Sequence, residues 1–100
     1  MSATLELVTF RLAQGTVAGF VAANDTVNQW LKRQPGFLSR HLAEKEDGSF
    51  VDLVLWDSAE AARDASKNMI GEIGESEAMT MIDPATVGMV HGSVRLSLGI

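Results

Sequence analysis

The chain has 100 residues and no cysteine, and its eight lysines and arginines against thirteen aspartates and glutamates give a net charge of −5. The lack of cysteine excludes disulfides, thiolate metal sites and cysteine nucleophiles. Nucleic-acid binding is not expected, because phosphate recognition needs a basic stripe and the sequence has none. Because neither a membrane span nor a basic, apolar leader is visible, we expect a cytoplasmic protein with no membrane contact and a single domain over residues 1–100.

Two elements are expected before residue 35. Residues 5–12 (LELVTFRL) contain no glycine or proline and are rich in strand-favouring side chains. Thr16 is a suitable N-cap for a helix over residues 17–34, which the following Pro-Gly pair would end. One face of this helix carries the 3.6-residue pattern of a core-facing stripe: Phe20, Asn24, Val27 and Leu31.

A β-hairpin is predicted from residues 37–44 and 50–56, because the Asp-Gly pair at 47–48 is a strong two-residue turn signal. If that pair alone forms the loop, His41 and Asp52 lie diagonally on one face of the hairpin, within reach of a histidine–carboxylate contact. Apolar side chains occur on both faces. The hairpin is therefore expected to be covered on both sides.

The second half of the chain predicts a helix, a helical turn and a strand. Residues 58–70 begin with a serine that can act as an N-cap, and residues 75–82 form a short helical turn before an Asp-Pro pair. Residues 89–98 alternate as a last strand, with His91 and Arg95 on its polar side.

The order strand, helix, two strands, helix, strand is that of the split ferredoxin-like arrangement. We therefore predict an α+β sandwich with an antiparallel four-stranded sheet and helices on one face. The apolar side chains on the uncovered sheet face predict a homodimer that buries sheet against sheet.

Three segments resemble the antibiotic biosynthesis monooxygenase superfamily of dimeric α/β-barrel proteins. They are residues 5–12, the Gln-Pro-Gly-Phe entry at 34–37, and the VLWDSAEA segment at 54–61, and the likeness extends over about 5–98. The resemblance implies the dimeric barrel. The family's best-known members oxidise quinols or polyketide-derived aromatics with oxygen and without a metal or flavin, so no cofactor is expected.

The haem-degrading branch of that family is a poor match for this chain. That branch uses an asparagine on the first strand, a tryptophan within the second helix and a histidine after it. Residues 5–12 contain no asparagine, residues 58–70 contain no tryptophan, and residues 57–88 contain no histidine. Haem degradation by that mechanism is not predicted.

The quinone-forming branch matches better at a tryptophan that ends a strand. Trp56 fits that position, although Asp52 stands four residues earlier, where the branch has an asparagine. His41 and Arg95 are counterparts, by strand position, of a histidine and an arginine in that branch. An aspartate brings a negative charge where an amide would donate a hydrogen bond.

The leading hypothesis assigns a role to each candidate residue. His41, assisted by Asp52, would take a hydroxyl proton as a catalytic base, and Arg95 would stabilise the anion that forms. The substrate-binding residues would be Trp56, Asn24 and His91. No metal site is predicted, since the two histidines lie far apart in the chain and no ligand-spaced cluster occurs.

Each assignment also has a structural interpretation. His41 and Asp52 could form an ion pair on the sheet, and Trp56 could be a core residue. Asn24 could bond to a backbone carbonyl. His91 and Arg95 could belong to a dimer seam.

The sequence thus predicts a cofactor-independent monooxygenase that acts on a small aromatic or quinol-type substrate in a pocket between helices and sheet. The alternative is a non-catalytic dimer that binds a small apolar ligand, or a stress-related module without turnover.

Overall fold

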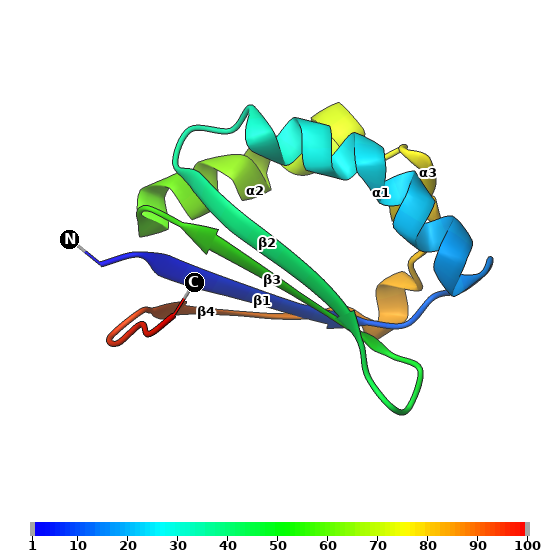
Figure 1. Cartoon of the computed structure of the whole chain (residues 1–100). Helices are drawn as coiled ribbons and strands as arrows, with labels where there is room; N and C mark the ends of the chain where they lie inside the picture. The colour runs from blue at the N-terminus through cyan, green and yellow to red at the C-terminus, as the bar shows by residue number, and fades with distance from the viewer. Residues whose placement is uncertain (1, 100) are drawn as a thin grey trace.

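The structure is a computed structural model and describes residues 2–99. Four strands form one antiparallel sheet in the order β2-β3-β1-β4. The helices cover one face of that sheet (Figure 1). The predicted antiparallel α+β sandwich of ferredoxin-like topology is confirmed. The strands are β1 (Thr4–Phe10), β2 (Phe37–Glu44), β3 (Phe50–Trp56) and β4 (Gly88–Ser93), and the helices are α1 (Val17–Lys32), α2 (Ala59–Ile73), α3 (Glu77–Met81) and the 3₁₀ turn η1 (Pro84–Thr86).

Both long helices begin at the predicted caps. The Thr16 hydroxyl accepts a hydrogen bond from the backbone N–H of Gly19, and the Ser58 hydroxyl accepts one from Ala61. Helix α2 continues past Gly71, where the sequence suggested an end, because Ile73 at its last turn is buried in the core. The predicted stripe of α1 is buried in full: Phe20, Asn24, Val27 and Leu31.

Aromatic side chains fill the two ends of the space between sheet and helices. Phe10, Phe20 and Phe50 form a cluster with ring centroids 5.2–5.7 Å apart near the hairpin end of the sheet. At the other end, Phe37 packs edge-on against Trp56, with ring centroids 5.9 Å apart. Between these two aromatic groups, the side chains on the helix-facing side of the sheet are smaller or more flexible.

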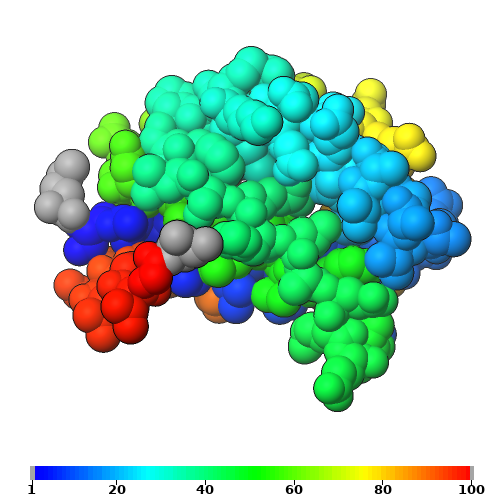
Figure 2. Space-filling model, viewed as in Figure 1, coloured from blue at the N-terminus to red at the C-terminus, as the bar shows by residue number. Residues whose placement is uncertain are grey.

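The β2–β3 hairpin has a longer loop than the sequence predicted. The backbone N–H of Lys45 donates to the carbonyl of Ser49, so three residues, not two, lie beyond the last pair. Gly48 adopts a φ of +85°, the left-handed conformation that closes a three-residue loop with a bulge. The loop projects from the body of the molecule (Figure 2).

Asp47 stabilises this loop from within. Its carboxylate accepts hydrogen bonds from the hydroxyl and the backbone N–H of Ser49. These two bonds, with smaller effects from the nearby cations Lys45 and Arg11, hold the pKa of Asp47 below its usual value.

The extra loop residue shifts the hairpin register by one position. Leu42 pairs with Asp52, His41 with Leu53, and Arg40 with Val54. A shift of one residue turns every side chain of β2 to the opposite face relative to β3. The predicted diagonal placement of His41 and Asp52 on one face is therefore wrong.

Strand β4 ends earlier than predicted. Its pairing with β1 stops at Thr4 and Ser93, and one further hydrogen bond joins the Val94 N–H to the Ala3 carbonyl. Residues 95–99 do not pair with β1, because that strand begins at Thr4. Arg95 consequently lies outside the strand on which the sequence placed it.

The sheet face away from the helices is apolar and only half-buried. It carries Leu5, Leu7, Leu53 and Leu55 from the two central strands. Large apolar side chains around it are exposed: Leu38, Val90, Leu96 and Leu98.

Candidate functional site

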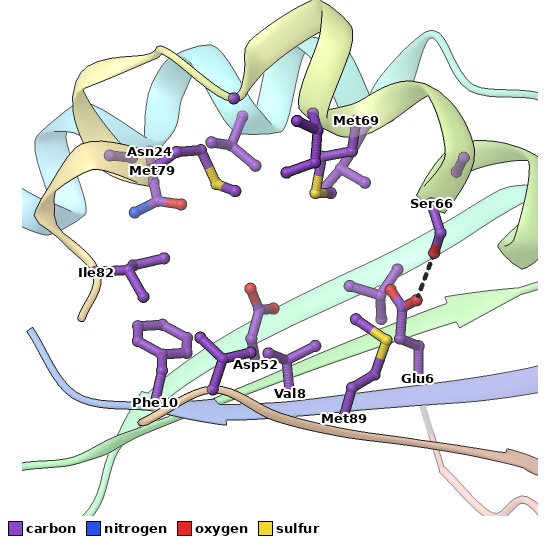
Figure 3. Close-up of a pocket in the computed structure, with 18 of the residues that line it drawn as sticks. Glu6, Val8, Phe10, Asn24, Asp52, Ser66, Met69, Met79, Ile82 and Met89 are labelled. Atoms are coloured by element: carbon purple, nitrogen blue, oxygen red, sulfur yellow. Dashed lines mark hydrogen bonds between the residues drawn. The ribbon is translucent and has the colours of Figure 1, made fainter. Parts of the chain in front are cut away.

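A cavity of about 650 Å³ lies between the sheet and the helices. This volume lies within the range of small-molecule sites. Figure 3 shows Val8, Asp52 and Met89 rising from the strands, while Met69 and Met79 approach from the helical side. Most of the wall is apolar, and its flexible methionines can adjust to a ligand's shape.

The register of the strands sets the floor of the cavity. Arg40 on β2 pairs with Val54 on β3, Val54 pairs with Glu6 on β1, and Glu6 pairs with His91 on β4. Directly paired residues point to the same face of a sheet, so this row faces the helices. The neighbouring row is Leu42, Asp52, Val8 and Met89.

Arg40 and Asp52 form a buried ion pair on this floor. The guanidinium approaches the carboxylate side-on, with Nη2 at 2.7 Å from Oδ2 and Nε at 3.0 Å from Oδ1. Nη2 also donates to the Asn24 side-chain oxygen and Nη1 to that of Asn28, both at 2.8 Å. The Asn24 amide nitrogen donates to the Phe20 carbonyl, which fixes the orientation of its side chain.

The hydrogen bonds of this cluster fix the positions of the Arg40 and Asp52 side chains, and the two opposite charges compensate each other. The side chains of Arg40 and Asp52 are 10% and 15% exposed. A buried charge without a partner is strongly destabilising, and here each charge meets the other with two-point geometry. A ligand at this end of the cavity would meet a carboxylate whose negative charge is already compensated.

A second polar cluster surrounds Glu6. One carboxylate oxygen, Oε2, lies 2.9 Å from Nε2 of His91 and accepts a hydrogen bond of 3.4 Å from the Ser66 hydroxyl (Figure 3). The Glu6 side chain is 8% exposed, whereas that of His91 is 42% exposed. The pair therefore connects the interior of the cavity with solvent.

Trp56 forms part of the wall at the end of β3. The residue is 1% exposed, and among residues 2–99 its indole N–H has no hydrogen-bond partner. A buried donor left unpaired costs about 1–3 kcal/mol. An oxygen atom of a ligand that reached this N–H would recover part of that cost.

The cavity opens beside β4, the edge strand that the helices leave uncovered. Three lining residues on this side are well exposed, at 70% for Ile70, 46% for Val87 and 51% for Met89. The lining residues under α1, by contrast, are buried. An apolar mouth and a polar floor suit a flat ligand that carries polar groups on its edge.

The structure brings together only some of the predicted site residues. Asp52, Trp56 and Asn24 line the cavity. His41 is exposed on the outer face of the sheet, because of the register shift described above. Arg95 is exposed beyond the end of β4, and neither Arg95 nor His91 lines the cavity, although His91 contacts Glu6, which does.

Two residues of the site were missed by the sequence analysis. Arg40 takes the place expected for His41, and only the true loop length could have revealed this. Glu6 was detectable, because it alternates with Val8 and Phe10 on the core-facing side of β1. A carboxylate at such a position needs a partner or a function.

Two further findings concern residues 2–99. No three histidine, aspartate or glutamate side chains in this part of the chain are grouped so that they could hold a metal ion. None of the helices described is both long and apolar enough to cross a membrane.

Comparison with known proteins gives matches in structure alone. No protein-family model matches the chain, and no curated protein matches its sequence closely. SnoaB, a cofactor-independent oxygenase from Streptomyces nogalater, is 22% identical with a TM-score of 0.68, over 100% of this chain and 98% of that one. The monooxygenase ActVA-Orf6 of Streptomyces coelicolor, in complex with the ligand nanaomycin D, is 23% identical with a TM-score of 0.72, over 99% and 93%.

A haem-degrading protein has the same fold. MhuD from Mycobacterium tuberculosis, with two haems in its active site, is 16% identical with a TM-score of 0.77, over 96% of this chain and 99% of that one. At these identities the likeness establishes the fold, which is shared with monooxygenases of the antibiotic biosynthesis type and with a haem degrader. The resemblance noted in the sequence is confirmed at that level.

Proposed function

We propose that this chain is a member of the antibiotic biosynthesis monooxygenase superfamily and a cofactor-independent monooxygenase of a small hydroxylated aromatic, such as a quinol. The observation that carries the proposal is the largely apolar cavity of about 650 Å³, whose few polar side chains include Glu6, Arg40 and Asp52 from the sheet and Asn24 and Ser66 from the helices. The shared fold with SnoaB and ActVA-Orf6 supports it.

The reaction balances without an external reductant. Loss of the hydroxyl proton leaves an electron-rich aryloxide, which dioxygen attacks at a ring carbon. That carbon bears a hydrogen, so the peroxide formed there loses water as its O–O bond and the ring C–H bond break. One oxygen atom stays as a quinone carbonyl, the other leaves as water, and the substrate supplies all four electrons. The protein needs only to orient the ring, accept the proton and exclude water.

The residues of the cavity divide these tasks. Apolar side chains such as Val8 and Met69 contact the faces of the ring, and Asp52 accepts a hydrogen bond from a ligand hydroxyl. Arg40 and Asn24 hold Asp52 and its surroundings in place. His41 and Arg95 are left out of this proposal, because neither lines the cavity.

Homodimerisation through the outer face of the sheet is part of the proposal. The half-buried leucines of β1 and β3, with exposed Leu38 and Val90, make a continuous apolar surface that a second copy of the same face would cover. A charge introduced there, as in Leu53→Arg, should give a monomer in sedimentation analysis. A protein that is monomeric without any substitution would contradict this part.

A non-catalytic ligand-binding dimer is the second candidate, and one observation favours it. The guanidinium of Arg40 already donates hydrogen bonds to Asp52, Asn24 and Asn28 in the absence of a ligand. A group that stabilises a developing anion should have donors free for that purpose.

Oxygen uptake separates the two candidates. The purified protein is incubated with a panel of quinols and hydroxylated aromatics in the presence of a metal chelator, and the oxygen consumed is compared with that of the buffer alone. Saturable uptake that a cavity-filling Val8→Phe variant loses would support the oxygenase. If oxygen uptake equals the buffer rate for every compound of the panel, the oxygenase is contradicted and the non-catalytic ligand-binding dimer is the remaining candidate.

A further inference from the structure

Glu6 links the interior of the cavity to an exposed titratable group. Its carboxylate lines the cavity, and the His91 ring it contacts is 42% exposed. Both contacts from the protein, those of His91 and Ser66, reach the same oxygen, Oε2. Among residues 2–99 no side chain or backbone group donates a hydrogen bond to the other oxygen, Oε1.

The surroundings of Glu6 leave this second oxygen to a ligand. In its row across the sheet, Val54 separates Glu6 from Arg40 on one side, and His91 follows on the other. Ser66 faces it from α2. His91 is the titratable group that contacts Glu6, and Arg40 and Asp52 are the other charged groups on this floor. Oε1 is not among the buried side-chain atoms that lack a partner, so it is accessible from the cavity that Glu6 lines, and a ligand hydroxyl in that cavity can donate to it.

We infer that Glu6 is the proton acceptor for a hydroxyl group of the bound ligand and that His91 carries this proton to solvent. The inference rests on the proposed function for the class of ligand, a hydroxylated aromatic. The hydroxyl donates to the Glu6 carboxylate, and as the O–H bond breaks, its electron pair stays on the ligand oxygen. The carboxyl group so protonated turns about its Cγ–Cδ bond until its O–H faces His91. With the ring hydrogen on Nδ1, Nε2 accepts the proton, and the imidazolium then releases the Nδ1 proton to water.

This arrangement gives the proton a route out of the cavity. A proton that Glu6 takes from a ligand has to leave after the ligand anion has reacted, since the carboxylate must be restored before it can accept from the next ligand. A half-exposed imidazole in direct contact with the base gives the proton an exit without opening the cavity. Glu6 touches the ligand, whereas His91 acts through Glu6.

The acceptor role predicts which form of a phenol binds. The probe is 4-nitrophenol, whose neutral and ionised forms differ in colour and interconvert near neutral pH. The wild type should bind the neutral form about tenfold or more tightly than the ion, because a carboxylate accepts from a hydroxyl and repels a phenolate. The Glu6→Gln variant should lose this preference, since an amide can donate to the ion.

Two controls accompany this binding experiment. Glu46→Gln makes the same charge change in the exposed hairpin loop and should leave the preference unchanged. 4-Nitroanisole, the methyl ether of the probe, cannot donate a hydrogen bond and should bind the wild type about tenfold more weakly than neutral 4-nitrophenol. This second comparison needs no variant, so it holds even if Glu6→Gln does not fold.

The exit route has its own readout, because the chain has two histidines. In NMR spectra, 4-nitrophenol should shift the ring signals and the titration of His91 but not those of His41, which lies on the opposite face of the sheet. In Glu6→Gln the response of His91 should disappear. The inference would be overturned if the wild type bound both forms of 4-nitrophenol equally tightly. It would also be overturned if the probe left the NMR titration of His91 unchanged.

The outcome is separable from that of the proposed function. If these binding and NMR results hold while no oxygen uptake is found, the oxygenase proposal fails and the hydroxyl site stands. If uptake is found but Glu6→Gln retains it in full with unchanged binding preference, the oxygenase stands and this inference fails.

Discussion

Arg40 and Asp52 lie diagonally on neighbouring strands and bind each other side-on, with Nη2 at 2.7 Å from Oδ2 and Nε at 3.0 Å from Oδ1. The pair depends on the register of the hairpin, since a two-residue loop would have turned Arg40 to the other face. A turn at the tip of the molecule thereby determines which side chains meet in the cavity.

Removing one partner of this pair should be costly. We expect Arg40→Met to lower the free energy of unfolding by about 3–5 kcal/mol, because it leaves the Asp52 carboxylate buried without its cation. Replacing both residues, as in Arg40→Met with Asp52→Leu, should cost less than the single change. Chemical denaturation of the three proteins measures this, and a single variant within about 0.5 kcal/mol of the wild type would contradict the buried pair.

The hairpin loop is tested at Gly48. With a φ of +85° and no atom within 4 Å of an added Cβ, Gly48→Ala should cost about 1–2 kcal/mol through backbone strain alone. Gly48→Asn should recover part of this, because asparagine tolerates the left-handed conformation. Thermal unfolding of the two variants gives the comparison. Equal stability of alanine, asparagine and glycine at this position would mean that the loop has another geometry.

His41 should have no part in ligand binding. The ring lies on the outer face of the sheet, so His41→Ala should keep the affinity for a hydroxyaromatic within about twofold of the wild type, an energy change of about 0.4 kcal/mol. Fluorescence titration with 2-naphthol measures the affinity. A tenfold loss in the alanine variant, with its fold intact, would restore His41 to the site.

The pKa of Asp47 responds to its neighbour Ser49. Because the folded-state pKa is lowered, the carboxylate contributes stability above the ordinary carboxyl value, near 3.9, and this contribution is lost as the pH falls through the lowered pKa. Ser49→Ala removes the hydroxyl donor but keeps the backbone donor, so the pKa of Asp47 should rise part of the way to its usual value. An NMR titration of the Asp47 carboxyl in both proteins would show it, and an unchanged pKa would refute the hydroxyl contact.

The sequence contained most of the fold. The helix caps at Thr16 and Ser58, the apolar stripe of α1 and the Asp-Gly turn signal each act locally, so each could be recognised from a few neighbouring residues. The end of β4 could not be recognised in this way, because it depends on the residue at which β1, far away in the sequence, begins to pair.

The candidate site was less predictable, for a physical reason. Asn24 was found because its amide interrupts the apolar stripe of α1, whereas Asp52 was found from its face on the hairpin and Trp56 from the family resemblance; all three line the cavity. Arg40 was missed because one additional loop residue reverses the faces of β2, and the Asp-Gly motif is compatible with either loop length. A register error of one residue changes which side chains meet across two strands, even when the bounds of both strands are predicted correctly.

The central claim is that the cavity between sheet and helices binds a hydroxylated aromatic, and equilibrium binding of 2-naphthol tests it most directly. The account predicts saturable, one-site binding to the wild type. It also predicts at least about tenfold weaker binding to Val8→Phe, which fills the floor of the cavity, and unchanged binding to Val21→Phe, on the exposed side of α1. Equal affinity of all three proteins, or no binding to any of them, would contradict it.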